Sequence, residues 1–465
     1  MSVSSAAPPR ANSRGRVLFA SVIGTSIEFY DFYIYATAAV LVFPTLFFPH
    51  AANPTVALLQ SFGAFGAAFI GRPLGSILFG HLGDRIGRKG TLVGSLLTMG
   101  LATFLIGCLP GASTPGWGFA APALLVLLRF LQGVGLGGEW SGAALLATEN
   151  APPGRRAIYG TFPQLGAPIG FIIANVFFLV VSKTMAPDFF ATWGWRFPFL
   201  ASAVLVLVGL YVRLQLVESS TFTRVKTEGH VTALPLAVTV GKHWKPLVLG
   251  TFNMLATYVI FYLLTAFLLT YGTTTNSIDK ARAAAEKAGK PFDPNGFTPG
   301  LGFARDDFLV MLIVGVVFFG VCVVVSGPLA ERFGRRKSLI WVTVVIGLYG
   351  LVWVPLFGLG NFAGIMAGII IGFILMGLTY GPMGALLPEM FPTNVRYTGS
   401  AVSYNLSSIL GAAVAPFIAV ALWSLADGSP VLVGLYLTGA AVVTLISLVL
   451  TSETRDTAYE DNLAG

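Results

Sequence analysis

The stretch GHLGDRIGRKG at residues 80–90 occurs a second time, in altered form, as GPLAERFGRRK at residues 327–337. Each copy follows a long apolar run, and in each an acid precedes an arginine by four residues. The corresponding positions are Gly80, Asp84, Arg85, Gly87 and Arg88 in the first copy and Gly327, Glu331, Arg332, Gly334 and Arg335 in the second. Such a repeat predicts a chain built from two related halves.

A second repeat, further along each half, supports this duplication. Its first copy holds Glu149, Pro152 and Arg156, and its second copy holds Glu389, Pro392 and Arg396 at the same spacing. Internal duplication is typical of secondary transporters, whose substrate site lies between two repeats that rock against each other.

The composition indicates that both halves lie in a lipid bilayer. Of the 465 residues, 55% are hydrophobic and only 10% are charged, and the mean hydropathy is +0.79. Water-soluble chains carry about 25% charged residues. The chain is therefore predicted to be a polytopic helical membrane protein, which excludes a soluble enzyme. The net charge of +8 does not indicate nucleic-acid binding, because the charges lie between apolar runs and not on one face.

Twelve apolar runs are long enough to cross a hydrocarbon core of about 30 Å, and a spanning backbone must be helical to satisfy its own hydrogen bonds. They lie at 17–43, 56–80, 91–110, 121–147, 157–182, 193–217, 246–271, 304–328, 338–357, 362–387, 397–424 and 430–451. The short loops at 44–55, 111–120 and 358–361 contain no Lys or Arg, whereas the N-terminal tail is basic. By the positive-inside rule, both termini are predicted to be cytoplasmic.

The predicted fold is an all-α polytopic membrane protein with twelve transmembrane helices in two pseudo-symmetric six-helix bundles. Its segments are a basic tail (1–16), the first bundle (17–217), a cytoplasmic linker (218–245), the second bundle (246–451) and a cytoplasmic tail (452–465). An extracytoplasmic insertion at 272–303 contains SIDKARAAAEKAGK, a helix-forming stretch that we expect to form a solvent-side cap.

With these motifs the chain resembles the major facilitator superfamily over essentially its full length, and the loop GHLGDRIGRKG is that superfamily's most specific signature. Four further stretches are similar to the metabolite:proton symporter family within it: GTSIEFYDFYIY, GRPLGSILFGHLGDRIGR, RFLQGVGLGGEWSGA and WGWRFPF. That family includes carriers of 2-oxoglutarate, citrate, shikimate, and proline or betaine. The resemblance implies the major facilitator fold, alternating access and proton symport.

Ionisable side chains inside spans mark functional sites, since each costs about 2.5–3.5 kcal/mol to insert. Away from the span edges they occur in the first half, as Glu28, Asp31, Arg72, Arg129 and Glu139. Glu28 and Asp31 lie three residues apart on one helical face, and two carboxylates that close cannot both ionise easily in a low dielectric. One of the two carboxylates is therefore protonated more readily than an isolated acid, which is what a proton carrier requires. The alternative is that hydrogen bonds to a neighbouring helix give Glu28 a structural role.

Arg129 is the expected partner of Asp31, because a count of about 1.5 Å per residue puts both at nearly the same depth. The resemblance adds that sugar-porter relatives use a first-span acid and a fourth-span arginine, and Asp31 and Arg129 occupy the matching positions. Asp31 is therefore the predicted proton site, with Arg129 as its competing partner and Glu28 as the next candidate. A permanent ion pair is the alternative.

Arg72 and Glu139 are level with each other, about 24 Å from the outer ends of their spans. We expect them to form a structural pair near the inner gate. In the superfamily, residues that match the repeated loops form ion-pair networks that close this gate. The predicted gate residues are Arg72, Asp84, Arg85, Arg88, Glu139, Glu149, Arg156, Glu331, Arg332, Arg335, Glu389 and Arg396.

Neutral polar side chains of the second half suit the wall of a substrate cavity. The predicted substrate contacts are Tyr35, Arg129, Gln164, Asn253, Tyr258, Tyr262, Tyr380 and Asn405, and Tyr404 has the same character. The four histidines lack the spacing of metal ligands, and GVGLGG at 133–138 follows no strand. No metal or nucleotide cofactor is therefore predicted.

Together these patterns predict a proton-coupled symporter, not an enzyme, in a bacterial-type plasma (inner) membrane. The predicted partners are a small-molecule substrate, protons and the lipid bilayer, with no nucleic acid, and the chain is expected to act as a monomer. An organic carboxylate is the favoured substrate, because Arg129 or Arg72 can neutralise it. The alternative is a zwitterion such as betaine or proline, whose cationic end Glu28, Asp31 and nearby aromatic rings would hold.

Overall fold

The computed structural model describes residues 14–51, 54–215, 233–287, 294, 297–358 and 360–456. Within these ranges the chain forms helices and no strand. Ten helical runs in this part of the chain are long and apolar enough to cross a membrane. Two further runs, α3 (Pro54–Arg85) and α17 (Arg335–Leu351) with the π-helical turn η4 (Val354–Gly358), complete the twelve that the sequence predicts.

The first half follows the predicted order of spans. It comprises α1 (Arg14–Leu41), α2 (Phe43–Phe47), α3, α4 (Arg88–Cys108), α5 (Ala120–Glu149), α6 (Arg156–Gln164), α7 (Gly166–Thr184), α8 (Pro187–Phe189), η1 (Phe190–Gly194) and α9 (Arg196–Leu214). The fifth predicted span is divided at Leu165 into α6 and α7. Pro163 and Pro168 flank this break, and neither has a backbone N–H to continue the helical hydrogen bonds.

The second half contains more breaks within its spans. Its elements are α11 (Pro235–Lys242), α12 (Trp244–Asn253), α13 (Leu255–Tyr262), η2 (Leu263–Phe267), α14 (Leu268–Thr273), α15 (Ile278–Lys287), α16 (Arg305–Phe333), α17, η4, α18 (Phe362–Glu389), α19 (Arg396–Ser408), η5 (Ile409–Ala413), α20 (Ala415–Leu425) and α21 (Val431–Leu450).

The helices that precede the two repeated loops are longer than predicted. The sequence analysis ended these spans at 80 and 328, but α3 continues to Arg85 and α16 to Phe333. Gly87 (φ 122°) and Gly334 (φ 95°) then turn the chain in a backbone region that side chains other than glycine avoid. Each repeated acid therefore lies in the last turn of one helix, and each repeated arginine lies at the start of the next.

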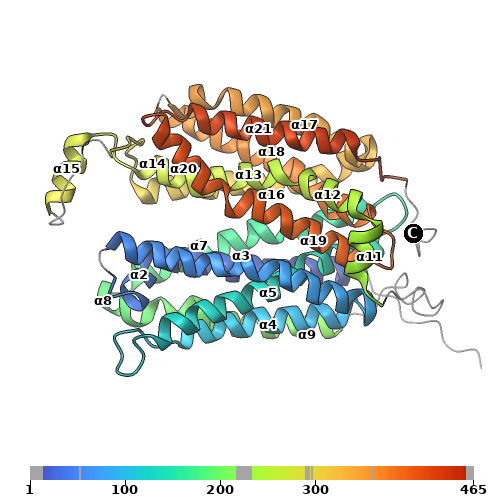
Figure 1. Ribbon diagram of the computed structural model, residues 1–465, viewed down its shortest axis with the longest axis horizontal. Helices are drawn as coiled ribbons and strands as arrows, with labels where there is room; N and C mark the ends of the chain where they lie inside the picture. The colour runs from blue at the N-terminus through green and yellow to red at the C-terminus, as the bar shows by residue number, and fades with distance from the viewer. Residues whose placement is uncertain are drawn as a thin grey trace, which may run out of the picture.

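Figure 1 shows the two halves one above the other, with the helices along the long axis of the molecule. In the first half α3 packs on α5, and in the second half α16 packs on α18 in the same way. The close approach of α3 and α5 requires glycine, since a Cβ atom on Gly75 would lie 1.9 Å from the carbonyl oxygen of Val134. A Cβ atom on Gly137 would lie 2.1 Å from the carbonyl oxygen of Arg72.

The halves meet mainly through helix ends near the marked C-terminus. There α19 packs on α3, and α6 packs on α16 and α18 (Figure 1). This part of the molecule contains both repeated loops, and we call it the gate end. The element α11, which is the described part of the predicted linker, packs against α3 and α19 beside it.

Parts of the predicted tails, linker and insertion lie outside the described residues. These are 1–13 of the basic tail, 216–232 around the start of the linker, 288–293 and 295–296 of the insertion, and 457–465 of the C-terminal tail.

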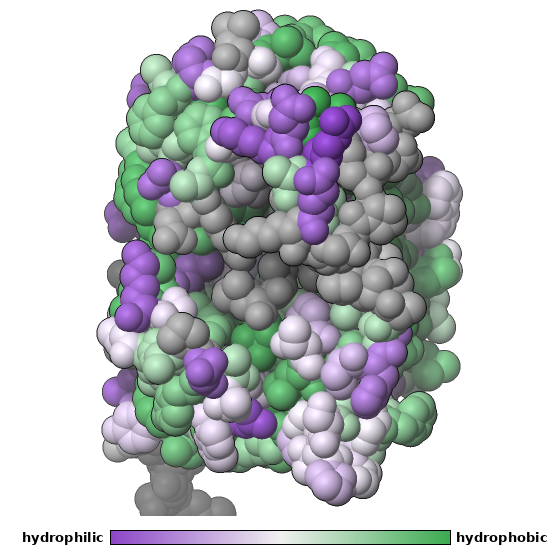
Figure 2. All heavy atoms as spheres, turned by 90° about the vertical axis from the view of Figure 1, so that its left-hand side faces the viewer, coloured by the Kyte–Doolittle hydropathy of each residue, from purple (hydrophilic) through white to green (hydrophobic). Residues whose placement is uncertain are grey.

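The insertion at 272–303 lies at the end opposite the gate end. Its helix α15 projects away from the bundle (Figure 1), on a face where hydrophilic side chains are spread over both halves (Figure 2). Backbone hydrogen bonds join the two ends of the insertion. The N–H of Gly300 donates to the carbonyl of Thr275 at 3.2 Å, and that of Gly302 donates to Thr274 at 2.8 Å.

We expect that deletion of residues 278–296 leaves membrane expression and uptake close to those of the wild type. The joined ends of the insertion remain in this variant, and exposed loops tolerate such shortening. Uptake per amount of inserted protein measures the effect. A longer deletion of 274–300, which removes the joined ends, should lower expression. Loss of uptake at normal expression in the shorter variant would mean that α15 gates the pathway or binds substrate.

Candidate functional site

A small cavity lies between the two halves. Its walls come from α1, α3 and α7 on one side and from α13, α18 and α19 on the other. The lining residues are Phe29, Phe32, Tyr33, Arg72, Ala167, Tyr258, Phe261, Tyr262, Met376, Tyr380 and Tyr404. Its volume of about 20 Å³ holds little more than one water molecule. A metabolite therefore requires the halves or their aromatic side chains to separate.

Three of the predicted substrate contacts, Tyr258, Tyr262 and Tyr380, line this cavity, and so does Tyr404. The sequence analysis did not single out Tyr33, although it lies in the first-span stretch that carries Glu28 and Asp31. A period of 3.6 residues places Tyr33 near the face of Phe29 and Phe32, which would have been the signal for it.

Two further predicted substrate contacts, Asn253 and Asn405, are absent from the cavity wall in this conformation. The amide of Asn253 donates to Oγ1 of Thr451 at 3.0 Å, and the amide of Asn405 donates to the carbonyl of Gly137 at 3.0 Å. Both side chains therefore join helices and do not line the cavity. Hydropathy identifies a polar residue within a span but not the direction of its side chain.

Arg72 is the cationic side chain of the cavity wall. It is only 3% exposed, and its guanidinium lies over the rings of Phe32 at 5.2 Å and Phe69 at 5.6 Å. It makes no hydrogen bond or ion pair with any residue in the described ranges, and its Nε atom is buried without a partner. A buried guanidinium in this condition is available to an anion that enters the cavity.

The predicted pair of Arg72 and Glu139 is wrong. Glu139 instead forms a buried ion pair with Arg213 of α9 and accepts a hydrogen bond from Oγ of Ser95 at 2.9 Å. Arg213 also donates to the carbonyl of Leu92 at 2.5 Å, so the group joins α4, α5 and α9. Equal depth did not identify the partner, because depth does not specify the direction in which a side chain points around the axis of its helix.

Asp31 accepts hydrogen bonds from two hydroxyl groups, Ser202 Oγ at 2.6 Å and Thr103 Oγ1 at 2.9 Å. Gln132 connects this group to Arg129. Its amide nitrogen donates to Thr103 Oγ1 at 2.7 Å, and its amide oxygen accepts from the guanidinium of Arg129. Asp31 and Arg129 thus share one polar network but form no direct ion pair. Gln132 could have been found from the sequence, because it follows Arg129 by three residues on the same helical face.

Three aromatic rings lie close to the guanidinium of Arg129. Its guanidinium carbon lies 4.1 Å from the ring centre of Tyr35, 4.8 Å from that of Phe65 and 5.0 Å from that of Phe32. Arg129 is fully buried and is not among the lining residues. Tyr35 packs on this arginine and does not face the cavity either, so the predicted substrate contacts of Arg129 and Tyr35 are absent from this conformation.

Glu28 is buried, and neither oxygen of its carboxyl group has a hydrogen-bond partner within the described part of the chain. The charged side chains that act on it most strongly are Arg72 and Arg213. Its charge also acts on the cavity tyrosines Tyr380 and Tyr404. The hydrogen bonds that would have given Glu28 a structural role are therefore not found.

Side chains from both halves close the cavity toward the gate end. Trp140 stacks on Tyr404 with ring centres 3.9 Å apart and planes at 7°. Its indole N–H donates to Oε1 of Gln164 at 2.7 Å, and the amide of Gln164 donates to the carbonyl of Tyr380 at 2.8 Å. Gln164, a predicted substrate contact, thus bridges the halves below the cavity. Tyr380 and Tyr404 belong to both the cavity wall and this closure.

The gate end is held by carboxylates that bind the start of a helix in the opposite half. Asp84 accepts hydrogen bonds from Thr398 N at 2.9 Å, Thr398 Oγ1 at 2.8 Å and Tyr397 N at 3.2 Å, all in the first turn of α19. Glu331 accepts one from Ala157 N at 2.6 Å, in the first turn of α6. Carboxylates suit the N-terminus of a helix, where N–H groups are unsatisfied and the dipole is positive.

Ion pairs surround these contacts in a repeated pattern. Each repeated arginine binds the acid of its own loop and an acid at the end of another helix: Arg88 binds Asp84 (3.4 Å) and Glu149 (3.4 Å), and Arg335 binds Glu331 (2.8 Å) and Glu389 (3.2 Å). The pattern agrees with the predicted closure of this end by residues of the two loops.

Four further predicted gate residues behave differently. Arg156 and Arg396 are the first residues of α6 and α19; Arg156 acts electrostatically on Glu389, and Arg396 is fully buried. Arg85 and Arg332 are exposed and take no part in the contacts between the halves described above, so their role at the gate stays a prediction. They follow the buried acids by one residue, and one step on a helix turns the side chain by about 100°.

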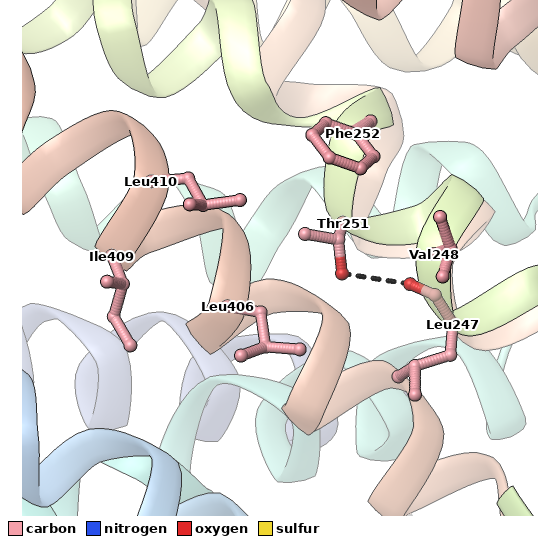
Figure 3. Close-up of a pocket in the computed structure, with 7 residues that line it drawn as sticks. All are labelled: Leu247, Val248, Thr251, Phe252, Leu406, Ile409 and Leu410. Atoms are coloured by element: carbon pink, nitrogen blue, oxygen red, sulfur yellow. Dashed lines mark hydrogen bonds between the residues drawn. The ribbon is translucent and has the colours of Figure 1, made fainter. Parts of the chain in front are cut away.

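A larger hollow lies elsewhere and has no polar wall. It measures about 270 Å³ and lies between α12 and the segment of α19 and η5 (Figure 3). Its lining residues are Leu247, Val248, Thr251, Phe252, Leu406, Ile409 and Leu410. The hydroxyl of Thr251 is bound to the carbonyl of Leu247, so no free polar group is directed into it. This hollow therefore offers no free polar group to a charged or polar ligand.

Comparison with known proteins agrees with this architecture. The model of the Major Facilitator Superfamily matches residues 22–416. The chain is 54% identical to the inner membrane metabolite transport protein YhjE of Escherichia coli (strain K12), covering 96% of this chain and 95% of that protein. It is 33% identical to the shikimate transporter of the same strain, covering 95% of each. It is 29% identical to the proline/betaine transporter of Salmonella typhimurium, covering 94% of this chain and 83% of that one.

Among solved structures, the fold is similar to that of the proton:xylose symporter XylE bound to 6-bromo-6-deoxy-D-glucose. The TM-score is 0.72 at 16% identity, and 94% of each chain is covered. At this identity the similarity concerns the fold alone.

Replacement of Asp84 by Asn should loosen the gate end, because an amide carries no charge to pair with Arg88 or to bind the helix start. The loss of hydrogen bonds to a charged group costs about 1–3 kcal/mol. We expect a cysteine at Thr161, which is 1% exposed, to react faster with a water-soluble thiol reagent, about tenfold for each 1.4 kcal/mol. Cys108 and Cys322 are first removed.

The matched control is Arg85→Gln, since Arg85 belongs to the same loop but is exposed. Its labelling rate should equal that of the parent. An unchanged rate in Asp84→Asn would show that this carboxylate does not hold the gate end closed.

Proposed function

The chain belongs to the major facilitator superfamily, and from this membership we propose that it is a proton-coupled symporter that imports a small organic carboxylate by alternating access. The observation that carries the proposal is Arg72, a buried guanidinium in a cavity between the halves, without an ionic partner in the described structure. A cation in low dielectric requires a counter-charge. A carboxylate of the substrate supplies it.

Alternating access is supported by the contacts that join the halves at the gate end. At the gate end, Asp84 and Glu331 bind helix starts across the halves, and the stack of Trp140 on Tyr404 closes the cavity above them. Release of substrate on this side requires these contacts to break together. In the predicted topology the repeated loops are cytoplasmic. We therefore assign this conformation as closed to the inside.

The coupling ion is proposed to be a proton carried by an acid of α1. Asp31 and Glu28 are the two candidates, both fully buried. The second half has no acid in its spans away from their ends, which confines coupling to the first half.

The proposed location is the plasma (inner) membrane, as a multi-pass monomer with both termini in the cytoplasm. The distribution of Lys and Arg over the short loops supports this orientation. The relative at 54% identity is itself named an inner membrane protein.

A zwitterion such as proline or betaine is the second candidate substrate. Glu28 near Arg72 supports it, because the cavity region then offers both charges, and the aromatic wall suits a cationic end. Uptake of labelled shikimate, 2-oxoglutarate, citrate, proline and betaine into proteoliposomes under an inward pH gradient separates the two candidates. We expect a carboxylate to accumulate and a protonophore to abolish this accumulation. Accumulation of proline or betaine alone would favour the zwitterion.

Replacement of Arg72 by Gln should weaken carboxylate binding by about 2–5 kcal/mol, the cost of truncating one partner of a buried charge pair, which is roughly 30-fold or more in Kd. Arg72→Lys should retain part of the affinity, since it keeps the charge without the planar fork. Binding to purified protein in detergent measures the effect.

The control for this experiment is Arg129→Gln. It removes another buried arginine of the same half, but one that is not among the residues lining the cavity. This variant should lower the unfolding temperature or the transport rate and leave Kd nearly unchanged. Equal Kd values for Arg72→Gln and the wild type would refute the assigned role of Arg72.

A further inference from the structure

Glu28 differs from the other buried acids of the first half. Asp31 is held by Ser202 and Thr103, and Glu139 by Arg213 and Ser95. Both carboxyl oxygens of Glu28 lack a hydrogen bond in the described structure. Unsatisfied polar atoms in a membrane interior are costly. Glu28 directly precedes Phe29 of the cavity wall, and unsatisfied oxygens are expected there if a ligand or a proton completes the site.

The charged groups around Glu28 can be assigned helix by helix. On α3, Arg72 makes no ion pair, while on α9, Arg213 is already paired with Glu139 of α5. On α5, the guanidinium of Arg129 lies against aromatic rings and is bound to Gln132. On its own helix α1, Asp31 binds to α4 and α9 through hydroxyl groups.

The second half contributes no ionised side chain to this environment within the described residues. Its groups near Glu28 are the hydroxyls of Tyr380 on α18 and Tyr404 on α19, and α1 adds that of Tyr33. The uncompensated charges are therefore one cation, Arg72, and one acid, Glu28. With Glu28 ionised and no substrate bound, the charges of Arg72 and Glu28 add up to zero.

We propose, building on the function proposed above, that the cavity takes one carboxylate of a monocarboxylate on Arg72 together with one proton on Glu28. Entry of a single negative charge would leave the site with a net charge of −1, which a low-dielectric interior disfavours. Protonation of Glu28 returns the sum to zero. Proton symport then follows from charge balance at Arg72 and Glu28.

The requirement for zero net charge at Arg72 and Glu28 defines the class of substrate. A dicarboxylate such as 2-oxoglutarate would require two protons, and the described cavity has no second free cation for its second carboxylate. A zwitterion such as proline brings no net charge and would bind without a proton. The expected substrate is therefore a monocarboxylate with an uncharged body, and the tyrosine hydroxyls of the wall suit hydroxyl groups on that body.

The test is the number of protons taken up when shikimate, a hydroxylated monocarboxylate, binds the purified full-length protein. Titration calorimetry in two buffers of different ionisation enthalpy gives this number directly. We expect one proton per shikimate in the wild type, with affinity that rises as the pH falls. Glu28→Gln should bind shikimate with no proton uptake and little pH dependence, because its site carries a permanent charge of +1 when empty.

Asp31→Asn discriminates between the two acids of α1: it should still take up one proton, and loss of this uptake in Asp31→Asn alone would assign the proton to Asp31 and overturn the inference. Glu28→Asp should also take up one proton, and thermal unfolding checks that each variant is folded. Uptake of one proton by Glu28→Gln, or of none by the wild type, would overturn the inference even if shikimate binds. Binding of 2-oxoglutarate to the wild type with a single proton would also overturn it. If proline binds and no carboxylate does, the proposed function itself is refuted.

Discussion

The carboxylate of Asp84 at the start of α19 is the contact on which the observed conformation depends. It accepts hydrogen bonds from two backbone N–H groups and one hydroxyl of the opposite half, so it links the halves through the backbone itself. Seven residues further along α19, Tyr404 stacks on Trp140 and closes the cavity. The position of that ring follows from the position of the helix that Asp84 holds. The contacts of Asp84 thus affect both the closure of the gate end and the shape of the cavity.

Charge compensation distinguishes the structural acids from the functional site. At the gate end and in the core of the first bundle, buried acids such as Glu139 have arginine or hydroxyl partners. Arg72 and Glu28 have no such partners in the described structure. Arg72 lines the cavity between the halves, and Glu28 acts electrostatically on Tyr380 and Tyr404 of the opposite half. An uncompensated charge destabilises a membrane protein, so it persists where a ligand compensates it in part of the cycle. The lack of partners is therefore the strongest structural argument for the location of the site.

The small volume of the cavity has a mechanical consequence. Tyr380 and Tyr404 both line the cavity and take part in its closure, so a substrate that displaces these rings also disturbs the contacts between the halves. In the proposed cycle, substrate binding and gate opening would therefore involve the same side chains. The larger apolar hollow between α12 and α19 has no such connection, since its wall contains no free polar group (Figure 3).

Hydropathy and internal repetition sufficed to predict the twelve spans and the duplication of the halves, and they singled out the acids and arginines that pair at the gate end, which are Asp84, Arg88, Glu331 and Arg335. Hydropathy and repetition encode these features locally, because a spanning helix must be apolar over a fixed length. Three of the cavity tyrosines were also identified from their position in the spans. Only the tertiary structure decided which charges meet. The sequence predicted Arg72 with Glu139, but Glu139 binds Arg213, and Arg72 remains free in the cavity. Depth along a helix can be counted from the sequence, whereas the rotation of each helix about its axis is set by packing, and that rotation selects the partner.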